Sequence, residues 1–442
     1  MIFGLSPLAS DSSAVAVPVG VPVRIAVAGA GLRGSAYART AAAAGGAVIT
    51  AVAEPDRERR ERFAAEHGIP SEHVFTDWAD LAAAPKLADA AIVATQDGEH
   101  VGPAVALAKA GYHLMLEKPM ATTEADCAAI VEAAECSGVM LAVCHVLRYT
   151  SYTAKIKELI ADGRLGDVVS IQHLEPVGWW HQAHSYVRGN WRREEESSPM
   201  LLAKACHDVD WLVYVMGVLP ERVSSFGELV HFRAENKPAG AASNCLDCRV
   251  ESTCPYSAPR LYNSCLGDPA KELWPLSAVT TDHTRAGIER ALREGPYGRC
   301  VYECDNDVVD NQVVAFDFGG GRTATLTMTA FTPLDFRKTR IMGTRGYLEG
   351  DGRTLAVLDY TTEAWEHLDA TEAGAGSDAS AADGHGGADA RLVEAFVTAV
   401  ATGDSSHILS DPRESLAGHR VVWAAERARH TGTVQDIRPA AR

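Results

Sequence analysis

A glycine-rich turn near the start of the chain constrains the fold more than any other feature of the sequence. Residues 25–28 are a short apolar run that follows Arg24, residues 29–34 follow as G-x-G-x-x-G, and a helix-forming segment comes next. In that context Gly29 permits a tight turn, Gly31 lets the backbone approach a pyrophosphate, and Gly34 allows close packing of helix on strand. The N–H groups at the start of the helix would face the phosphates. The segment therefore predicts a dinucleotide site, and a glycine-rich turn without a ligand is the alternative.

Strands and helices alternate over the first part of the chain. Helical segments lie between further short apolar runs, which predict strands at 48–53, 90–95, 113–116 and 139–144. Such alternation predicts a parallel, doubly wound sheet. We therefore expect an α/β, Rossmann-type nucleotide-binding domain over residues 22–150, preceded by a disordered extension over residues 1–21.

The second part, residues 151–442, has a different pattern. Residues 168–174 alternate between apolar and polar side chains, which predicts a half-buried strand. More strands are expected at 222–229, 313–318, 323–331 and 339–348, and helices at 153–162, 201–216, 390–401 and 415–430. We therefore expect an α+β domain with an open, mainly antiparallel sheet, and a mobile loop at 370–388.

Charge and hydropathy exclude several classes of protein. The net charge of −17 over 442 residues argues against a nucleic-acid partner. No apolar run is long enough to span a bilayer, and residues 1–20 lack the basic start of a secretory signal. Apolar residues make up 47% of the chain, as in ordinary globular proteins. We therefore expect a cytoplasmic, enzyme-like protein without a membrane partner.

The second expected strand ends in Glu54, at the distance from the glycine turn where dinucleotide-binding domains carry an acidic residue. A carboxylate there can accept hydrogen bonds from both ribose hydroxyls, and it would repel a 2′-phosphate, so NAD is the expected cofactor. Four arginines follow on the next expected helix, at positions 57, 59, 60 and 62. They could neutralise a 2′-phosphate, which keeps NADP as an alternative, or they could form a solvated helix face.

Five segments occur together in the order typical of one family. They are the Gly29 turn, Glu-Pro-Asp at 54–56, the loop 94–100, Glu-Lys-Pro at 117–119, and His-Asp-x-Asp at 207–210. On these segments, which fall within about residues 22–350, the chain resembles the glucose-fructose oxidoreductase / inositol dehydrogenase / MocA family. The resemblance implies a Rossmann domain followed by an α/β domain whose open sheet often makes oligomer contacts. It also implies binding of NAD or NADP, action on sugars or polyols, and a homodimer or homotetramer.

The expected catalytic residues are Lys118, His207 and Lys204. Lys118 lies just past the end of an expected strand, where its ammonium could stabilise negative charge on a substrate oxygen. His207 suits the proton transfer that accompanies hydride transfer. A surface lysine and a buried structural histidine are the alternatives. Many family members carry a carboxylate four residues before this histidine, but this chain has Ala203 there, followed by Lys204. A second cation could favour an anionic substrate or an enolate.

The ligand-contacting residues are expected in two groups. The resemblance and the strand ends give the cofactor group: Gly29, Gly31, Leu32, Arg33, Gly34, Glu54, Thr95, Gln96, His100, Glu117 and Lys118. Residues 178–192 are dense in aromatic side chains, histidine and arginine, which suit the apolar faces and the hydroxyls of a carbohydrate. The substrate group is His145, Arg148, Trp179, Trp180, His184, Tyr186, Asp208 and His385. A packed loop or an oligomer contact is the alternative for the aromatic run.

Cysteines cluster in an expected insertion at about residues 235–305. In a cytosolic protein, a metal explains such clustering better than disulfides. A closed zinc site needs four thiolates in tetrahedral geometry, and we expect a structural zinc ion on Cys245, Cys248, Cys254 and Cys300, with Cys304 or Cys265 as a substitute. An iron–sulfur cluster and simple buried thiols are the alternatives. The insertion resembles that of a subgroup of the family.

Three functions follow from these patterns. In the first, an NAD-dependent oxidoreductase acts on a sugar, glycoside or polyol: His207 takes the hydroxyl proton, Lys118 stabilises the oxygen, and the hydride goes to C4 of the nicotinamide. In the second, a glycoside is cleaved without net redox change by oxidation, elimination, hydration and reduction; Lys204 beside His207 is compatible with the enolate that this route requires. In the third, the chain binds NAD without catalysis and needs neither Lys118 nor His207.

Overall fold

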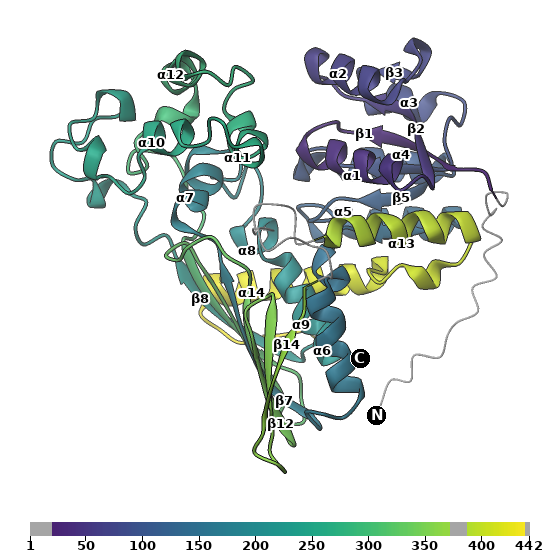
Figure 1. Cartoon of the computed structure of the whole chain (residues 1–442), viewed down its shortest axis with the longest axis vertical. Coiled ribbons are helices and arrows are strands. Elements are labelled where there is room, and N and C mark those ends of the chain that lie inside the picture. The colour runs from purple at the N-terminus through teal and green to yellow at the C-terminus, as the bar shows by residue number, and fades with distance from the viewer. Residues whose placement is uncertain (1–19, 372–386, 438–442) are drawn as a thin grey trace. The chain divides into compact units, whose positions relative to one another are not determined.

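The computed structural model describes residues 20–371 and 387–437, which fall into two compact units (Figure 1). Unit 1 comprises the chain up to Cys144 together with Ala390–Leu416, and unit 2 comprises His145–Asp389 and the chain from Ala417 onward. The chain therefore returns to unit 1 near its C-terminus, a return that the expected boundary at residue 150 did not include. Most of the expected N-terminal extension and of the loop 370–388, with His385, lies outside the described residues.

Unit 1 contains the parallel sheet that the alternation predicted. Its six strands are all parallel and lie in the order β3-β2-β1-β4-β5-β6. Their bounds are β1 Val23–Ala28, β2 Ala47–Ala53, β3 Val74–Phe75, β4 Ala90–Val93, β5 His113–Leu116 and β6 Leu141–Val143. The strand order reverses between β1 and β4, and sheets of this type bind nucleotides beyond the carboxyl ends of the strands at that point.

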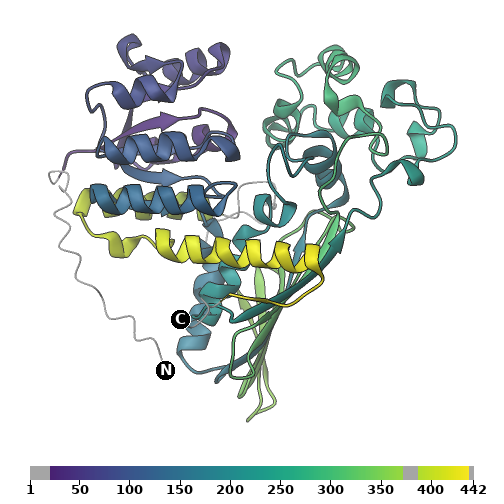
Figure 2. The same cartoon turned by 180° about the vertical axis from the view of Figure 1, so that it is seen from behind.

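Six helices belong to unit 1: α1 Leu32–Ala43, α2 Arg57–His67, α3 Trp78–Ala83, α4 Val101–Lys109, α5 Glu124–Ser137 and α13 Ala388–Thr402. Side-chain hydrogen bonds cap the N-termini of α2, α3 and α5. At the start of α5 the Thr123 hydroxyl accepts a hydrogen bond from the Asp126 amide, and Gly138 ends the helix with a φ of 64°. In both views α13 lies beside α5, although the two helices are far apart in the sequence (Figures 1 and 2).

Unit 2 is built on a nine-stranded sheet in the order β14-β13-β12-β11-β7-β10-β9-β8-β15. All neighbours are antiparallel except β7 and β10, so the sheet is mainly antiparallel, as predicted. The strands are β7 Val168–Pro176, β8 Arg222–Glu228, β9 Asn311–Asp317, β10 Thr323–Thr329, β11 Lys338–Gly343, β12 Gly346–Gly350, β13 Thr354–Asp359, β14 Trp365–Asp369 and β15 Gln435–Asp436.

Within the described residues, one face of this sheet carries the core. Its inward side chains, such as Val314 and Leu326, pack against the helices α6 Ser151–Ala161, α9 Cys206–Met216 and α14 Pro412–Thr431. On the opposite face, Phe226 and its cross-strand neighbour Val313 are 70% and 37% exposed. Antiparallel sheets tolerate one uncovered face, and here that face includes large apolar side chains.

A lobe of short helices connects β8 to β9 and contains the clustered cysteines. Its helices are α10 Ala258–Asn263, α11 Pro269–Leu273 and α12 Arg285–Glu294, and within unit 2 they lie with α7 Trp179–His181 at one end of the sheet (Figures 1 and 2). The lobe's own apolar cluster is small and includes Tyr262, Leu276 and Ile288. None of the described helices combines the length and hydropathy that crossing a membrane requires.

The glycine turn gives a first prediction. A Cβ at Gly34 would lie 2.0 Å from the carbonyl oxygen of Gly29, so Gly34→Ala has to push α1 away from the turn. We expect this variant to lose about 1–3 kcal/mol of unfolding free energy, measured by chemical denaturation. Gly98→Ala is the control in the same unit, because nothing lies within 4 Å of its added Cβ. Equal stabilities of the two variants would contradict the tight packing.

Candidate active site

In the glycine turn of unit 1, Gly29 and Gly34 are closely packed, whereas the space beside Gly31 is open. Gly29 has a φ of 92°, and a Cβ there would lie 2.5 Å from the carbonyl oxygen of Ala94. At Gly31, by contrast, an added Cβ would meet only a terminal nitrogen of Arg59, at 3.9 Å. Space is therefore open beside Gly31, at the N-terminus of α1, where a pyrophosphate would accept hydrogen bonds from the helix.

Glu54 fixes the geometry of the turn. Its Oε2 accepts a hydrogen bond from the Ala30 amide at 2.9 Å, and its Oε1 accepts one from the Asp56 amide at 3.0 Å. The carboxylate thus connects the glycine turn to the start of α2. Arg59 Nε lies 3.8 Å from Glu54 Oε1, so a guanidinium cation lies next to the carboxylate that is expected to bind the ribose. This neighbour keeps both NAD and NADP compatible with the site.

Glu117 holds the backbone of Lys118 at the end of β5. Its Oε1 accepts hydrogen bonds from Arg33 Nε at 2.7 Å and from the Tyr37 hydroxyl at 2.8 Å, and its Oε2 accepts the Lys118 amide at 2.6 Å. Burial alone would raise the pKa of Glu117, but the charges of Arg33 and Lys118 and these hydrogen bonds lower it overall. A charged carboxylate therefore ties α1 to the predicted catalytic lysine.

His100 connects the loops that follow β4 and β5. Its Nδ1 lies 2.8 Å from the carbonyl oxygen of Pro119 and its Nε2 lies 3.2 Å from that of Thr95, and the ring is almost fully buried. The Thr95 hydroxyl in turn donates to the carbonyl of Glu99. These contacts favour a supporting role for His100 over direct contact with the nucleotide. The other cofactor candidate at the start of α1, Leu32, is 42% exposed.

His207 lies in unit 2, in the first turn of α9. The continuous helix predicted for 201–216 is wrong: α8 ends at Ala203, α9 begins at Cys206, and Lys204 falls in the break between them. The ring of His207 is buried, and its centre lies 5.9 Å from that of His145 in an edge-on arrangement. The Nε2 of His145 in turn lies 3.8 Å from an oxygen of Asp210.

Arg148 and Asp210 form a buried, bidentate ion pair next to His145. Arg148 Nε and one terminal nitrogen each donate to an Asp210 oxygen at 2.8 Å. Burial alone would raise the pKa of Asp210, but the Arg148 charge lowers it overall. Arg148 was expected to contact substrate, and this pairing favours a positioning role instead, because its guanidinium holds α9 through Asp210.

A second buried network surrounds Lys204. Its Nζ lies 3.1 Å from Glu175 Oε1, and Arg337 Nε lies 2.6 Å from Glu175 Oε2 and 2.9 Å from Asp208 Oδ1. His173 Nε2 completes the group, 3.0 Å from the same Asp208 oxygen. Two carboxylates therefore face two basic side chains, Lys204 and Arg337. The Lys204 ammonium has a carboxylate partner in Glu175, so its charge does not by itself favour an anionic substrate.

Sequence reasoning missed Glu175, Arg337 and His173. His173 and Glu175 could have been found from the sequence. Residues 171, 173 and 175 alternate along β7 and share its inward face, and polar side chains on a buried face need buried hydrogen-bond partners. Burial alone would raise the pKa of Asp208, but Arg337 and His173 lower it overall. Asp208, expected to contact substrate, is thus committed to this network.

The aromatic segment packs mainly on the lobe of short helices. His184 and Tyr186 are buried, whereas Trp179 is 40% exposed. The ring of Trp180 lies 5.3 Å from that of Trp274 in the lobe. The structure therefore favours packing for His184 and Tyr186, and among the predicted carbohydrate ligands that lie in the described residues Trp179 is the most accessible.

The predicted thiol set lines one cavity. A small pocket, partly open to solvent, is bordered by Cys245, Cys248, Cys254 and Cys300, together with Arg188. Burial raises the pKa of both Cys254 and Cys300, so these thiols are protonated at neutral pH unless a metal displaces the proton.

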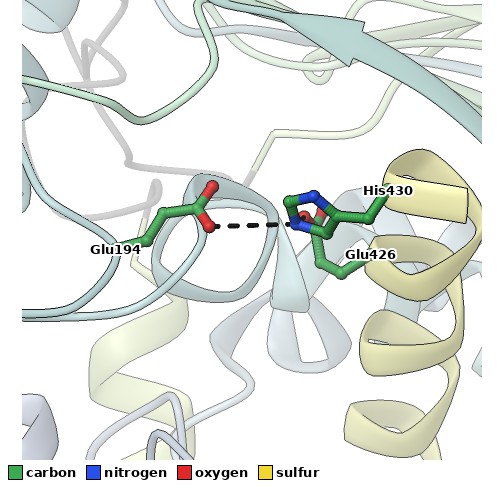
Figure 3. A group of neighbouring side chains, drawn as sticks. All are labelled: Glu194, Glu426 and His430. Atoms are coloured by element: carbon green, nitrogen blue, oxygen red, sulfur yellow. Dashed lines mark ion pairs between the residues drawn. The ribbon is translucent and has the colours of Figure 1, made fainter.

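Another group of ligand-type side chains consists of Glu194, Glu426 and His430 (Figure 3). Among the residues that the structure describes, it alone brings three such ligand atoms within 4.8 Å of one another. Arg429, however, places a terminal nitrogen 2.8 Å from Glu194 and 2.7 Å from Glu426. This arginine already supplies the positive charge that the two carboxylates require.

The burial of His184 gives a prediction on pH. Burial lowers its pKa to about 3, with the charge of Arg188 acting in the same direction. The unfolded chain takes up this proton near pH 6.5, about the usual histidine value, but the folded chain does not. Stability is therefore highest above that pH and falls as the pH drops, by up to about 1.4 kcal/mol per pH unit from this group.

Replacing His184 with asparagine removes that contribution, so the decline in unfolding free energy between about pH 6 and pH 4 becomes shallower. Urea unfolding at a series of pH values measures it. His367→Asn is the control, because His367 is exposed. The same slope in wild type and His184→Asn would show that the ring is not held neutral.

Known proteins resemble this chain in sequence and in fold. YteT of Bacillus subtilis, an oxidoreductase by name, is 27% identical over 271 residues, which cover 60% of each chain. The 2,7-anhydro-N-acetylneuraminate hydratase of Escherichia coli is 29% identical over 205 residues, 46% of this chain and 52% of the hydratase. The chain thus spans little more than half the length of these curated relatives. A levoglucosan dehydrogenase structure with NADH and levoglucosan shares the fold, with a TM-score of 0.70 at 17% identity over 95% of this chain and 100% of that one.

Family models match both units of the chain. Residues 23–145 match the model of an oxidoreductase family with an NAD-binding Rossmann fold, and residues 157–435 match the C-terminal alpha/beta domain of the same family. The Rossmann order of unit 1 and the mainly antiparallel sheet of unit 2 agree with this pair of domains. The chain therefore belongs to the glucose-fructose oxidoreductase / inositol dehydrogenase / MocA family of oxidoreductases.

Proposed function

We propose that this chain is an NAD-dependent oxidoreductase that transfers hydride between the nicotinamide and a carbon bearing a hydroxyl group in a sugar, glycoside or polyol. The observation that carries the proposal is the contact of Glu117 with the Lys118 amide at the carboxyl end of β5. This hydrogen bond fixes the backbone of Lys118 at the carboxyl ends of the parallel strands, where nucleotides bind in such folds. The levoglucosan dehydrogenase named above is a sugar-directed member of the same fold.

In this proposal the protein's own residues bind, orient and move a proton. Gly29, Gly31 and Glu54 hold the nucleotide, which when bound supplies the hydride acceptor. His207 takes the proton of the substrate hydroxyl as general base. Lys118 stabilises the negative charge that develops on the same oxygen. NAD is the preferred cofactor because Glu54 repels a 2′-phosphate, and NADP is the alternative through Arg59.

The second candidate is redox-neutral cleavage of a glycoside, in which oxidation, elimination, addition of water and reduction follow one another on one bound cofactor. The name of the Escherichia coli relative, a hydratase of an anhydro sugar acid, favours this candidate. Lys204 would assist the enolate in this route, and Glu175 would position its ammonium.

The variants Lys118→Met and His207→Asn test both the dehydrogenase and the redox-neutral cleavage hypotheses. Loss of either group should lower kcat about 10²–10⁴-fold, because it removes charge stabilisation or proton transfer. Nucleotide binding measured by calorimetry should stay close to wild type in His207→Asn, because His207 is not among the expected cofactor contacts. Activity is followed as NADH formed with a panel of sugars, glycosides and polyols. The exposed Lys109→Met is the matched control.

Full activity in both variants would contradict catalysis at these residues. Tight binding of NAD by the wild type without turnover of any substrate in the panel would instead support an NAD-binding protein without that chemistry. Release of the aglycone from an aryl glycoside in heavy water, with deuterium incorporated at C2 and no net NADH, would select the redox-neutral route over the dehydrogenase.

We also propose a homodimer or homotetramer formed through the uncovered face of the unit 2 sheet. Phe226 and Val313 lie opposite each other there and are exposed. Phe226→Asp should lower the mass found by analytical ultracentrifugation, because it places a charge in an apolar contact. Leu219→Asp, which lies outside the strands and is also exposed, is the control. The same mass for both variants and the wild type would contradict an interface on this face.

A cytoplasmic location and a thiolate-bound metal with a structural role complete the proposal. The sequence predicts zinc for that metal. All ten cysteines are free thiols in this structure, as the reducing cytosol favours. The metal would join segments of the lobe of short helices that share only a small apolar cluster.

A further inference from the structure

We infer that Cys245, Cys248, Cys254 and Cys300 hold a [4Fe–4S] cluster in the lobe of short helices, rather than a single zinc ion. The inference concerns unit 2 alone and is independent of the proposed reaction. It rests on which thiols share a cavity, on a buried arginine in the wall of that cavity, and on the spacing of the sulfurs.

The cavity selects four of the six clustered cysteines. Cys245 begins η6 Cys245–Asp247, Cys248 and Cys254 follow in the same loop, and Cys300 comes from the start of the next loop after α12; all four line the pocket. The remaining two thiols bond elsewhere. Cys265 donates to the carbonyl of Leu261 at 3.4 Å, and Cys304 donates to the carbonyl of Cys300 at 3.3 Å. The fold thus separates one set of four thiols from two that serve local turns.

Arg188 lines the same cavity and is only 1% exposed. Its Nε donates to the Arg299 carbonyl at 2.8 Å, and its Nη2 donates to the Tyr256 carbonyl at 2.9 Å and to Cys245 Sγ at 3.4 Å. Its Nη1 is buried and has no hydrogen-bond partner within the described part of the chain. A buried guanidinium needs an opposite charge. Four thiolates around a dipositive core carry a net charge of about −2 and supply it.

As placed in the structure, the sulfurs do not converge on a single ion. A tetrahedral zinc site with Zn–S distances of about 2.3 Å brings every pair of sulfurs to about 3.8 Å. In the residues that the structure describes, no three cysteine sulfurs lie within 4.8 Å of one another. A cubane cluster binds each thiolate to a different iron, so its four sulfurs stand farther apart than those around one ion.

The sequence spacing agrees with this choice. Structural zinc sites commonly combine two short Cys-x-x-Cys pairs. This set has one such pair, Cys245 and Cys248, followed by two single cysteines, with Pro255 directly after Cys254. Tyr256, Val301 and Tyr302 pack around the thiols and shield them from solvent. The cluster we infer joins the 245–254 loop to residue 300 and has a structural role.

The test is a metal and sulfide analysis of the full-length chain. We expect the protein, purified without oxygen or reconstituted with iron and sulfide, to be brown and to contain about four irons and four acid-labile sulfides per chain. Mössbauer spectra of the wild type should show the cubane directly, so the result does not depend on a variant that folds.

Variants then assign the ligands. Cys248→Ser and Cys300→Ser should lose most of the iron and sulfide, whereas the controls Cys265→Ser and Cys304→Ser should keep them. Arg188→Gln should lower the amount of cluster retained after exposure to a chelator, because it removes the cation beside Cys245. One zinc per chain without sulfide, no bound metal in the reconstituted wild type, or full iron in Cys300→Ser would each overturn the inference.

Discussion

The candidate site in unit 1 depends on one buried carboxylate. Glu117 accepts hydrogen bonds from Arg33 and Tyr37 on α1 and from the amide of Lys118 on the other side. Because α1 starts at the glycine turn, the same carboxylate connects the expected phosphate site to the expected catalytic lysine. A buried charge of this kind is costly unless it is fully hydrogen-bonded, and Glu117 meets that condition. Its loss would therefore disturb two functional positions at once.

Unit 2 also contains buried carboxylates that are paired with cations, and there they form larger networks. Behind His207 lies the Arg148–Asp210 pair, and around Lys204 lie Glu175, Arg337 and Asp208. Networks of this type orient their members strongly, because each group loses several contacts if it turns away. Lys204 and His207 are adjacent to a break between two helices, so this network, rather than a continuous helix, fixes their positions.

Much of the fold could be predicted because its signals are local. The glycine turn, the parallel strands and the Thr123 cap are each encoded within a few consecutive residues. β3 was not predicted, because two residues are too few to show a periodic pattern. The packing of α13 in unit 1 was not predicted either, because a helical pattern does not indicate which element the helix packs against. The candidate site shows the same limit. Lys204 was recognised as a departure from the family pattern, but its carboxylate partner, Glu175, comes from a strand well before it in the sequence.

The path of the chain through the two units limits how they can be separated. Unit 1 needs Ala390–Leu416 as well as the N-terminal segment, and α13 supplies buried apolar side chains, among them Leu392 and Phe396. A single cut after Cys144 would therefore release a nucleotide-binding fragment with an uncovered apolar patch. Recombination that exchanges unit 2 between relatives has to join the chain at three places. The architecture thus favours divergence by substitution and by change of loop length over exchange of whole domains.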